Sequence, residues 1–290
     1  MVRINVAFAF DENLWLQTAV AIFSLAHNAR RGVRYHVYCL VDQNVHGAMR
    51  DLVRQIVRRA GRRTRIHFVE FNGNALSHQF YDDGRARFPR AAMARLFLPK
   101  LLPRVRKIIW LDSDIIVAGD LRELWRTPMV GRLIGAVRDV NIAAVEKQYP
   151  DEFAHYPEYG LRAMVDKCEY VNSGVLVMNL REMRVFGWTE QCMQRVRRET
   201  RNIWYFDQDV INSVCRGRIE YVSIRFNRMA KMGPGNYIAA YQQAGLGRAD
   251  LITDYYNYTI LHYAGNDKPW GGVGPYVDIW RMYAKMAGVL

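Results

Sequence analysis

Short apolar runs and amphipathic stretches alternate through the N-terminal part of the chain. The expected strands are residues 6–8, 35–40 and 66–69, and the expected helices are residues 16–28 and 46–60. In the second helix Met49, Val53 and Ile56 recur at helical spacing. This alternation is typical of a parallel sheet with helices on both faces, in which ligands bind beyond the carboxyl ends of the strands.

The rest of the chain continues the pattern less regularly. The expected strands are residues 107–111, 115–117, 132–137, 174–179 and 260–263, and the expected helices are residues 182–200 and 210–215. Residues 139–167 are polar and irregular, which is typical of a lid or of an excursion that binds an acceptor. Residues 227–258 are rich in Gly, Asn and Tyr and are expected to be looped.

The composition indicates a globular protein with an anionic partner or a strongly basic surface. The 290 residues are 50% hydrophobic, which is enough for one large domain or two small ones. The formal charge is +13, and 34 of the 41 basic residues are arginines, whose planar donors fit phosphate and carboxylate. Phosphates, acidic lipid and nucleic acid are all candidate partners, and a solvated surface without a partner is the alternative.

Cysteine spacing and hydropathy point to a reduced, cytoplasmic protein. The four cysteines contain no C-x-x-C pair, which argues against a zinc cluster, and they are expected to be reduced and mostly buried. Asp11 and Glu12 interrupt the first apolar stretch too early for a signal peptide. The longest apolar run, residues 19–26, falls far short of the ~20 residues of a membrane-spanning helix.

Two aspartates directly follow the apolar run 108–111. In an extended segment, residues two apart point to the same side, so Asp112 and Asp114 would aim their carboxylates at one point. Two like charges so close are costly unless a cation lies between them. Oxygen ligands suit Mg²⁺ or Mn²⁺, which also take phosphate oxygens. A turn or a helix cap is the alternative, because Asp is common in both.

His262 ends a second apolar run and opens a short polar loop. An isolated histidine in such a place is commonly a packed or capped residue, but the loop also contains Gly265 and Lys268. Imidazole can complete the coordination of Mn²⁺. Glycine lets the backbone approach a phosphate, and lysine supplies a positive charge for it.

Other polar residues at the ends of elements are ambiguous by themselves. Asp11 and Asn13 can bind a base or a ribose, or form an ordinary polar turn. Asp207 can be the N-cap of a helix, and Asn172 lies in a turn before a strand. Arg95 lies in a mostly apolar helical stretch, where an arginine should find an anion or a carboxylate.

Taken in order, these segments resemble family 8 retaining glycosyltransferases, the lipopolysaccharide galactosyl- and glucosyltransferase group to which glycogenin is related. The resemblance extends from about residue 4 to residue 270. The segments that carry it are residues 8–13, 94–96, 110–114, 172–180, 207–209 and 262–270. Each segment is weak or moderate alone, but six of them in the family's order are not expected by chance.

The resemblance implies an α/β fold of the GT-A type, a single Rossmann-like mixed sheet flanked by helices, over residues 1–270. It also implies a UDP-sugar donor and Mn²⁺, with Mg²⁺ as the alternative metal. The expected metal ligands are Asp112, Asp114 and His262. The residues expected to bind the donor and the cofactor are Ala9, Asp11, Asn13, Arg95, Asp112, Ser113, Asp114, Asn172, Asp207, Gln208, His262, Gly265 and Lys268.

Within this set the resemblance implies catalytic roles for Asp207, Gln208 and Lys268. Gln208 matches the position beside the reacting sugar carbon, and an amide is a poor nucleophile. Retention through a covalent intermediate normally needs a carboxylate. Same-face attack by the acceptor hydroxyl is therefore expected, with Gln208 orienting or stabilising the sugar and Lys268 adding positive charge beside the leaving diphosphate.

The expected reaction moves galactose or glucose to a glycan or glycolipid acceptor, such as a lipopolysaccharide core, in the cytoplasm or at the inner face of the membrane. Residues 271–290 are expected to form a helical tail, a candidate contact with a membrane or another subunit. No nucleic-acid partner is expected. Leu14 stands where the family often has a tyrosine that stacks on uracil, so the contact with the base departs from the family pattern.

Two other functions are compatible with part of the pattern. A sugar nucleotidyltransferase shares the sheet and the carboxylates, but it usually has a glycine-rich, lysine-bearing loop that residues 9–14 lack. A non-enzymatic protein that binds nucleic acid or membrane would account for the charge. It would not account for Asp112, Asp114 and His262, each of which closes an apolar run.

Overall fold

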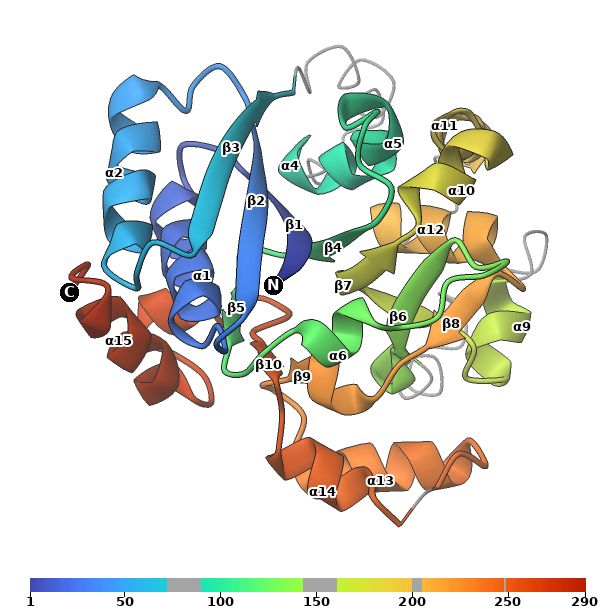
Figure 1. The fold of residues 1–290 in the computed structure, drawn as a ribbon. Coiled ribbons are helices and arrows are strands. Elements are labelled where there is room, and N and C mark those ends of the chain that lie inside the picture. Colours follow the sequence, from blue (N-terminus) through green and yellow to red (C-terminus); the bar gives the residue numbers. More distant parts are fainter. Residues whose placement is uncertain (72–89, 143–160, 200–204, 248) are drawn as a thin grey trace.

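Four parallel strands form the N-terminal half of the main sheet. The computed structural model describes all residues except 72–89, 143–160, 200–204 and 248. The four strands are β1 (Val2–Phe10), β2 (Val33–Val41), β3 (Thr64–Glu70) and β4 (Ile108–Leu111). They lie in the order β3-β2-β1-β4 (Figure 1). A helix between β1 and β2, and another between β2 and β3, return the chain and make the parallel pairing possible.

The direction of the sheet reverses at β7 (Val171–Met178), which pairs antiparallel with β4 on one side and with β6 (Ile134–Arg138) on the other. β8 (Ile219–Tyr221) then pairs parallel with β6. The complete order is β3-β2-β1-β4-β7-β6-β8, so the sheet is mixed. β4 and β7 are buried along their whole length, as central strands covered on both faces should be.

Helices cover both faces of the sheet and divide the apolar core into two layers. One layer lies under α1 (Trp15–His27) and α2 (Gly47–Arg58). The other lies under α4 (Arg90–Met93), the 3-10 turn η1 (Ala94–Phe97), α5 (Leu98–Leu101), α9 (Leu161–Asp166), α10 (Leu180–Phe186), α11 (Trp188–Glu199) and α12 (Asp207–Cys215). Strand residues alternate between the layers, so that Phe8 belongs to the first and its neighbour Ala7 to the second. The cysteines are free and three of the four are buried, as expected.

A small second sheet joins distant parts of the chain beside the end of β4. It contains β5 (Ile115–Val117), β10 (Ile260–His262) and β9 (Arg228–Met229), in the order β5-β10-β9. β10 pairs antiparallel with β5, and His262 lies opposite Ile115. The small sheet therefore brings His262, at the end of β10, next to Asp112 and Asp114, which lie between β4 and β5.

The helix expected over residues 182–200 is instead two helices, α10 and α11. Gly187 lies between them with a left-handed φ of 69° and ends α10. Glycine adopts this conformation without the steric cost that a Cβ would bring, so it is a common helix stop. Most of the excursion expected at residues 139–167 lies outside the described residues.

The interval 227–258 was expected to be a loop, and this expectation is wrong. It contains β9, α13 (Pro234–Gln243) and α14 (Leu251–Tyr256), and the two helices project at the bottom of the view in Figure 1. Tyr237 and Tyr255 are buried, and their ring centroids lie 5.5 Å apart between the two helices. Tyrosines, which in the sequence contributed to the loop prediction, thus supply the apolar contact between α13 and α14.

The C-terminal helix is present as α15 (Val277–Met286) and packs on α1. The Tyr283 hydroxyl accepts a hydrogen bond of 2.8 Å from Nδ2 of Asn28 at the end of α1. Arg281, Met282, Lys285 and Met286 lie on the exposed side of the helix, where the expected membrane or subunit contact would form. None of the helices in the described part of the chain combines the length and apolar character of a membrane span. The remaining short elements of the described residues are α6 (Arg122–Trp125) and the 3-10 turns η3 (Ile224–Phe226) and η4 (Pro269–Gly271).

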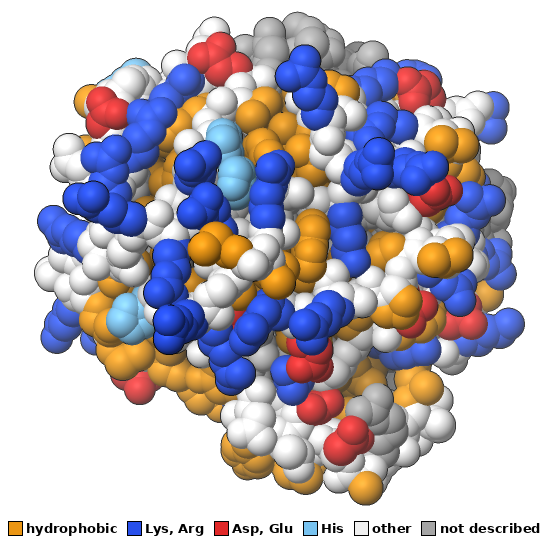
Figure 2. Space-filling model, viewed as in Figure 1, with side chains coloured by type: hydrophobic (Ala, Val, Ile, Leu, Met, Phe, Trp, Pro, Cys, Tyr) orange, Lys and Arg blue, Asp and Glu red, His pale blue; other side chains and the backbone are white. Residues whose placement is uncertain are grey.

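The excess basic charge is spread over the surface. Figure 2 shows Lys and Arg side chains across most of the viewed face instead of in one patch. Several arginines lie over aromatic rings of the same chain: Arg54 is 4.8 Å from the ring centre of Phe68, and Arg218 is 4.6 Å from that of Phe186. Part of the arginine content therefore stabilises the local surface and requires no external partner.

Phe8 in β1 has no exposed surface and belongs to the first core layer. We expect Phe8→Ala to lower the free energy of unfolding by about 3–5 kcal/mol, because a cavity replaces the ring. Urea unfolding followed by circular dichroism measures this change. Val2→Ala, in the same strand where the side chain is 36% exposed, should stay within about 0.5 kcal/mol of the unsubstituted chain. Equal losses for the two variants would contradict the core position of Phe8.

Candidate active site

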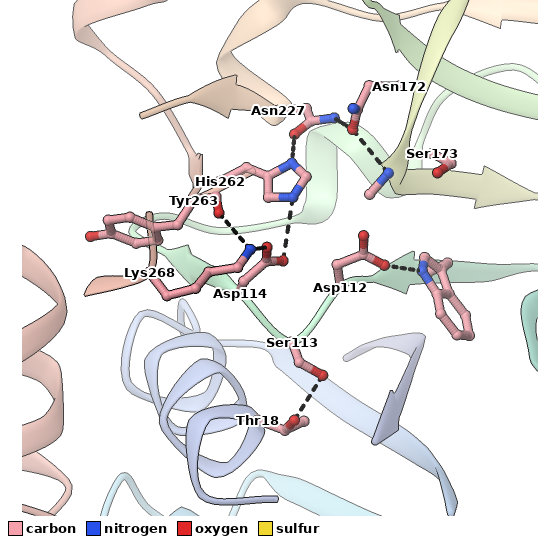
Figure 3. A network of polar contacts seen from close by, with 12 residues as sticks. Thr18, Asp112, Ser113, Asp114, Asn172, Ser173, Asn227, His262, Tyr263 and Lys268 are labelled. Atoms are coloured by element: carbon pink, nitrogen blue, oxygen red, sulfur yellow. Dashed lines mark hydrogen bonds and ion pairs between the residues drawn. The ribbon is translucent and has the colours of Figure 1, made fainter. Parts of the chain in front are cut away.

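Asp112, Ser113 and Asp114 connect β4 to β5, and the two aspartates lie on the opposite side of the segment from Ser113 (Figure 3). The Asp112 N–H donates to the Gly174 carbonyl of β7 at 2.9 Å. Oγ of Ser113 accepts a hydrogen bond of 2.8 Å from the Thr18 hydroxyl and donates to the Ala9 carbonyl at 3.1 Å. Ser113, expected among the cofactor-binding residues, thus ties the segment to α1 and β1 and holds both carboxylates on the other side.

His262 meets Asp114 through the pairing of β10 with β5. The Tyr263 N–H donates to the Asp114 carbonyl at 2.9 Å, and Nε2 of His262 lies 3.3 Å from Oδ1 of Asp114. One ligand atom from each of Asp112, Asp114 and His262 lies within 4.8 Å of the other two. Two carboxylates and one imidazole suit Mn²⁺, so the donor set fits a divalent cation.

The imidazole of His262 fits only because residue 174 is a glycine. A Cβ at this position would lie 2.3 Å from Cε1 of His262 and 2.9 Å from Nδ1. Real carbon atoms do not approach so closely, and Gly174 cannot move easily because it lies in the buried strand β7. The Asn-Ser-Gly turn of the sequence therefore supplies the space that the histidine ring occupies.

Arg95 lies between two acidic residues under the site. One guanidinium nitrogen donates to Oδ1 of Asp112 at 2.8 Å, a second donates to the Ser173 carbonyl at 2.5 Å, and Nε lies 3.0 Å from Oδ2 of Asp207. The side chain is only 3% exposed and stacks on the ring of Trp110. The expectation that a buried arginine here finds a carboxylate is confirmed.

Lys268 pairs with the second carboxylate. Its ammonium donates to Oδ2 of Asp114 at 2.5 Å and to the Tyr263 carbonyl at 2.9 Å. Gly265, in the same loop, has a left-handed φ of 98°, and Lys231 lies beside it, with Nζ 3.6 Å from where a Cβ would stand. The loop therefore places the Lys268 ammonium on the site, and the Lys231 side chain, which follows β9, lies beside Gly265.

Burial and neighbouring charges shift the acids of the site in opposite directions. Burial raises the pKa of Asp114, but a protonated His262 ring and the Lys268 ammonium together outweigh it and hold that pKa well below its usual range. Burial raises the pKa of Asp207 to about 6, with Arg95 acting against the rise and Asp112 adding to it. Asp114 is therefore a carboxylate ready to bind a cation, while Asp207 titrates closer to neutrality.

Gln208 is fixed by hydrogen bonds on both ends of its amide. Its Oε1 accepts from the Ser173 N–H at 2.9 Å and from Nδ2 of Asn172 at 3.2 Å, and its Nε2 donates to Oδ2 of Asp139 at 3.2 Å. Asp207 is the first residue of α12 and not its N-cap. That place belongs to Phe206, whose positive φ of 53° is costly for a bulky residue.

Asp139 and Asn227 belong to the same cluster, and the sequence patterns did not single them out. Oδ2 of Asp139 accepts hydrogen bonds from Asn172 and Gln208, whereas its buried Oδ1 has no partner among the described residues. Burial raises the pKa of this carboxyl. Asn227 contacts both His262 and Asn172. Asp139 follows a strand end as Asp112 does, a signal that could have identified it, but nothing local distinguishes Asn227.

The N-terminal polar segment forms a turn. Oδ1 of Asp11 accepts hydrogen bonds from the backbone N–H groups of Asn13 and Leu14, at 3.0 and 3.1 Å. Ala9 is buried, and its carbonyl binds Ser113. The turn thus follows a strand that is tied to the Asp112–Asp114 segment, although these contacts alone are those of an ordinary Asx turn.

Comparisons with known proteins agree with this geometry. The model of the family described as glycosyl transferase family 8 matches residues 5–273. The chain belongs to this family. Glycosyltransferase 8 domain-containing protein 1 of Bos taurus is 25% identical, with 97% of this chain and 77% of that protein covered. The chain is thus a glycosyltransferase, and the alternatives of a nucleotidyltransferase and of a non-enzymatic binding protein are disfavoured.

Solved structures confirm the expected GT-A fold. The galactosyltransferase LgtC, in complex with donor and acceptor sugar analogues, superposes with a TM-score of 0.73 at 24% identity over 99% of this chain and 96% of that one. The glycosyltransferase GlyE of Streptococcus pneumoniae TIGR4 superposes with a TM-score of 0.66 at 20% identity, covering 99% of this chain and 63% of that one. Enzymes with the GT-A fold generally use a nucleotide-sugar and a divalent metal, and the cluster of Asp112, Asp114 and His262 is compatible with such a metal.

We expect Gly174→Ala to weaken Mn²⁺ binding by about 10-fold or more, because the added methyl group displaces the His262 ring from Asp114. Titration calorimetry with Mn²⁺ measures the affinity. Gly47→Ala is the matched control, since a Cβ at residue 47 meets nothing within 4 Å. Unchanged affinity in the residue 174 variant would show that the ring position does not matter for the cation.

The raised pKa of Asp207 gives a pH-dependent contribution to stability. Between its usual value of 3.8 and about 6, folded Asp207 keeps a proton that the unfolded chain has lost. Its contribution to the free energy of unfolding must therefore fall as pH rises through this range. In urea unfolding from pH 4 to pH 7, the Asp207→Asn variant should lack this fall. If the unsubstituted protein instead became more stable relative to Asp207→Asn as the pH rises, the raised pKa of Asp207 would be contradicted.

Proposed function

We propose that this family 8 glycosyltransferase moves a hexose, galactose or glucose, from a UDP-sugar to a glycan acceptor with retention of configuration, and that Mn²⁺ is its metal. The observation that carries the proposal is the meeting of Asp112, Asp114 and His262, with Lys268 beside them. This donor set suits a divalent cation that also binds phosphate oxygens. The acceptor is proposed to be a glycan or glycolipid, such as a lipopolysaccharide core.

Different residues of the site are proposed to bind the diphosphate and the uridine of the donor. A cation held by Asp112, Asp114 and His262 would act as a Lewis acid that stabilises the charge of the leaving diphosphate. Lys268 exchanges its bond with Asp114 for one with a phosphate oxygen, and Gly265 lets the backbone approach the same group. Ala9, Asp11 and Asn13 are proposed to contact the uridine, and Leu14 contributes an apolar side chain in place of an aromatic ring.

The donor sugar is proposed to lie over Arg95, Asn172, Asp207 and Gln208. Arg95 holds the Asp207 carboxylate in place, and Asn172 and Gln208 are held by each other and by Asp139. Asp139 supports this arrangement, because its Oδ2 accepts hydrogen bonds from both Asn172 and Gln208. These polar side chains can thus bind several hydroxyl groups of the sugar, as its recognition requires.

The hydrogen bonds of Gln208 support same-face attack over a covalent intermediate. Its carbonyl oxygen already accepts from Ser173 and Asn172, which further reduces the reactivity of an amide oxygen. Asp209 is 1% exposed and accepts hydrogen bonds from the Tyr170 hydroxyl and the Tyr205 N–H. Asp207 is paired with Arg95, so all three side chains are engaged. The acceptor hydroxyl is then the nucleophile, the departing phosphate takes its proton, and a covalent adduct on Asp207 or Asp209 would overturn this mechanism.

The test is a panel of UDP-hexoses with Mn²⁺, in which released UDP is measured with and without glycan acceptors. Asp114→Asn should lower turnover by about 100-fold or more, because a neutral amide replaces a negatively charged metal ligand. Asp51→Asn, on the surface of α2, is the control and should retain full activity. Proton NMR of the product gives the configuration of the new bond. Near-normal turnover of Asp114→Asn would rule out the metal role, and an inverted product would rule out retention.

A further inference from the structure

His262 is held on both of its ring nitrogens. Nε2 faces Asp114 at 3.3 Å, and Nδ1 lies 2.8 Å from Oδ1 of Asn227 (Figure 3). Asn227 has no exposed surface and lies just before β9, which runs parallel to β10 in the small sheet. Neutral imidazole donates from only one nitrogen, so the contact with Asn227 decides which nitrogen keeps its lone pair.

The orientation of the Asn227 amide follows from a backbone donor. The Gly174 N–H lies 2.9 Å from Oδ1 of Asn172, and because an N–H can only donate, this atom of Asn172 must be the oxygen. Asn227 lies 2.8 Å from the same oxygen, so the atom that it presents is its Nδ2. The other end of the Asn227 amide, which faces Nδ1 of His262, is therefore the carbonyl oxygen.

Because the Asn227 oxygen can only accept, Nδ1 of neutral His262 carries the proton and Nε2 carries the lone pair. Nε2 then faces the Asp114 carboxylate, so two acceptors point at each other across 3.3 Å. Such an arrangement repels in the absence of positive charge and becomes favourable when a cation binds both groups. We propose that Asn227 is a positioning residue that fixes His262 in its Nδ1–H tautomer and so presents the Nε2 lone pair to the divalent cation.

The same contacts link the metal ligand to the sugar-binding residues. Nδ2 of Asn172 donates hydrogen bonds to Oε1 of Gln208 and Oδ2 of Asp139. Its Oδ1 accepts a hydrogen bond from Nδ2 of Asn227. Asn172, which is itself proposed to bind the donor sugar, therefore connects Gln208 and Asp139 with Asn227, the residue that orients His262. The Asn227 side chain contacts His262 and Asn172, so its proposed effect on the cation is exerted through His262.

The inference rests on the proposed function for the identity of the cation, but the tautomer can be measured without metal or donor. A long-range ¹H–¹⁵N NMR spectrum of the metal-free protein, recorded on the alkaline side of the ring's titration, distinguishes the two tautomers. His262→Gln identifies the signals of residue 262. The protein should show the Nδ1–H pattern, and Asn227→Leu should lose it in favour of a mixture. A predominant Nε2–H pattern in the unsubstituted protein would overturn the proposal.

Mn²⁺ affinity, measured by titration calorimetry, tests the consequence for binding. Asn227→Leu removes the acceptor with little change of size and should weaken binding by about 10–100-fold. Asn227→Asp keeps an oxygen beside Nδ1 but turns its second oxygen toward Oδ1 of Asn172, so its informative readout is the NMR spectrum. The aspartate variant should keep the Nδ1–H pattern that the leucine variant loses, a difference that a purely structural role would not produce. Equal Mn²⁺ affinities of the unsubstituted and leucine proteins, or the same tautomer pattern in both variants, would contradict the proposal.

If the unsubstituted protein bound no Mn²⁺, the proposed metal site would fail while the tautomer result still decided the role of Asn227. Circular dichroism of both variants shows whether each remains folded.

Discussion

The site depends on the electrostatic cost of holding two carboxylates and an imidazole lone pair within 4.8 Å of one another. Such groups repel in a largely buried place, and the chain offsets this with Arg95 on one carboxylate and Lys268 on the other. The two cations differ in exposure: Arg95 is 3% exposed and fixed, whereas Lys268 is 29% exposed at the rim. The fixed charge belongs to the scaffold, and the rim charge is free to move to a phosphate.

Rigid backbone segments hold these groups close together despite their repulsion. Asp112 and Asp114 follow the buried strand β4, and His262 is fixed by the pairing of β10 with β5. Gly174 in β7 gives the ring its space, and the backbone N–H groups of Ser173 and Gly174 orient the amides of Gln208 and Asn172. Two consecutive backbone donors thus determine how a whole cluster of side chains is arranged, because a backbone N–H cannot rotate or change its role.

Local patterns predicted those parts of the fold in which neighbours along the chain are also neighbours in space. The runs that become β1, β2 and β4 were predicted because burial on both faces makes strands continuously apolar, whereas β3 is only partly buried. The helices between β1 and β3 were predicted from their length and the helical spacing of their apolar residues. The break at Gly187 was missed, because a glycine inside a helical pattern is compatible with either a stop or a continuation. The helices of residues 234–256 were missed because their buried faces are short and rich in tyrosine: Tyr237 and Tyr241 in α13, and Leu251 and Tyr255 in α14.

The sequence by itself determined which residues have suitable chemistry: an Asp-x-Asp after an apolar strand, and a histidine with glycine and lysine behind it, in the order of a known family. That the two segments meet was implied only by the resemblance to the family, because their contact arises from pairing between strands far apart in the chain, which no local pattern shows. Nothing in the sequence pointed to Asn227 or to the space beside Gly174, because an asparagine before a short strand and a glycine in a turn have many uses. Only the packed structure shows what Asn227 and Gly174 do, since hydrogen-bond direction and excluded volume exist only between groups already brought together.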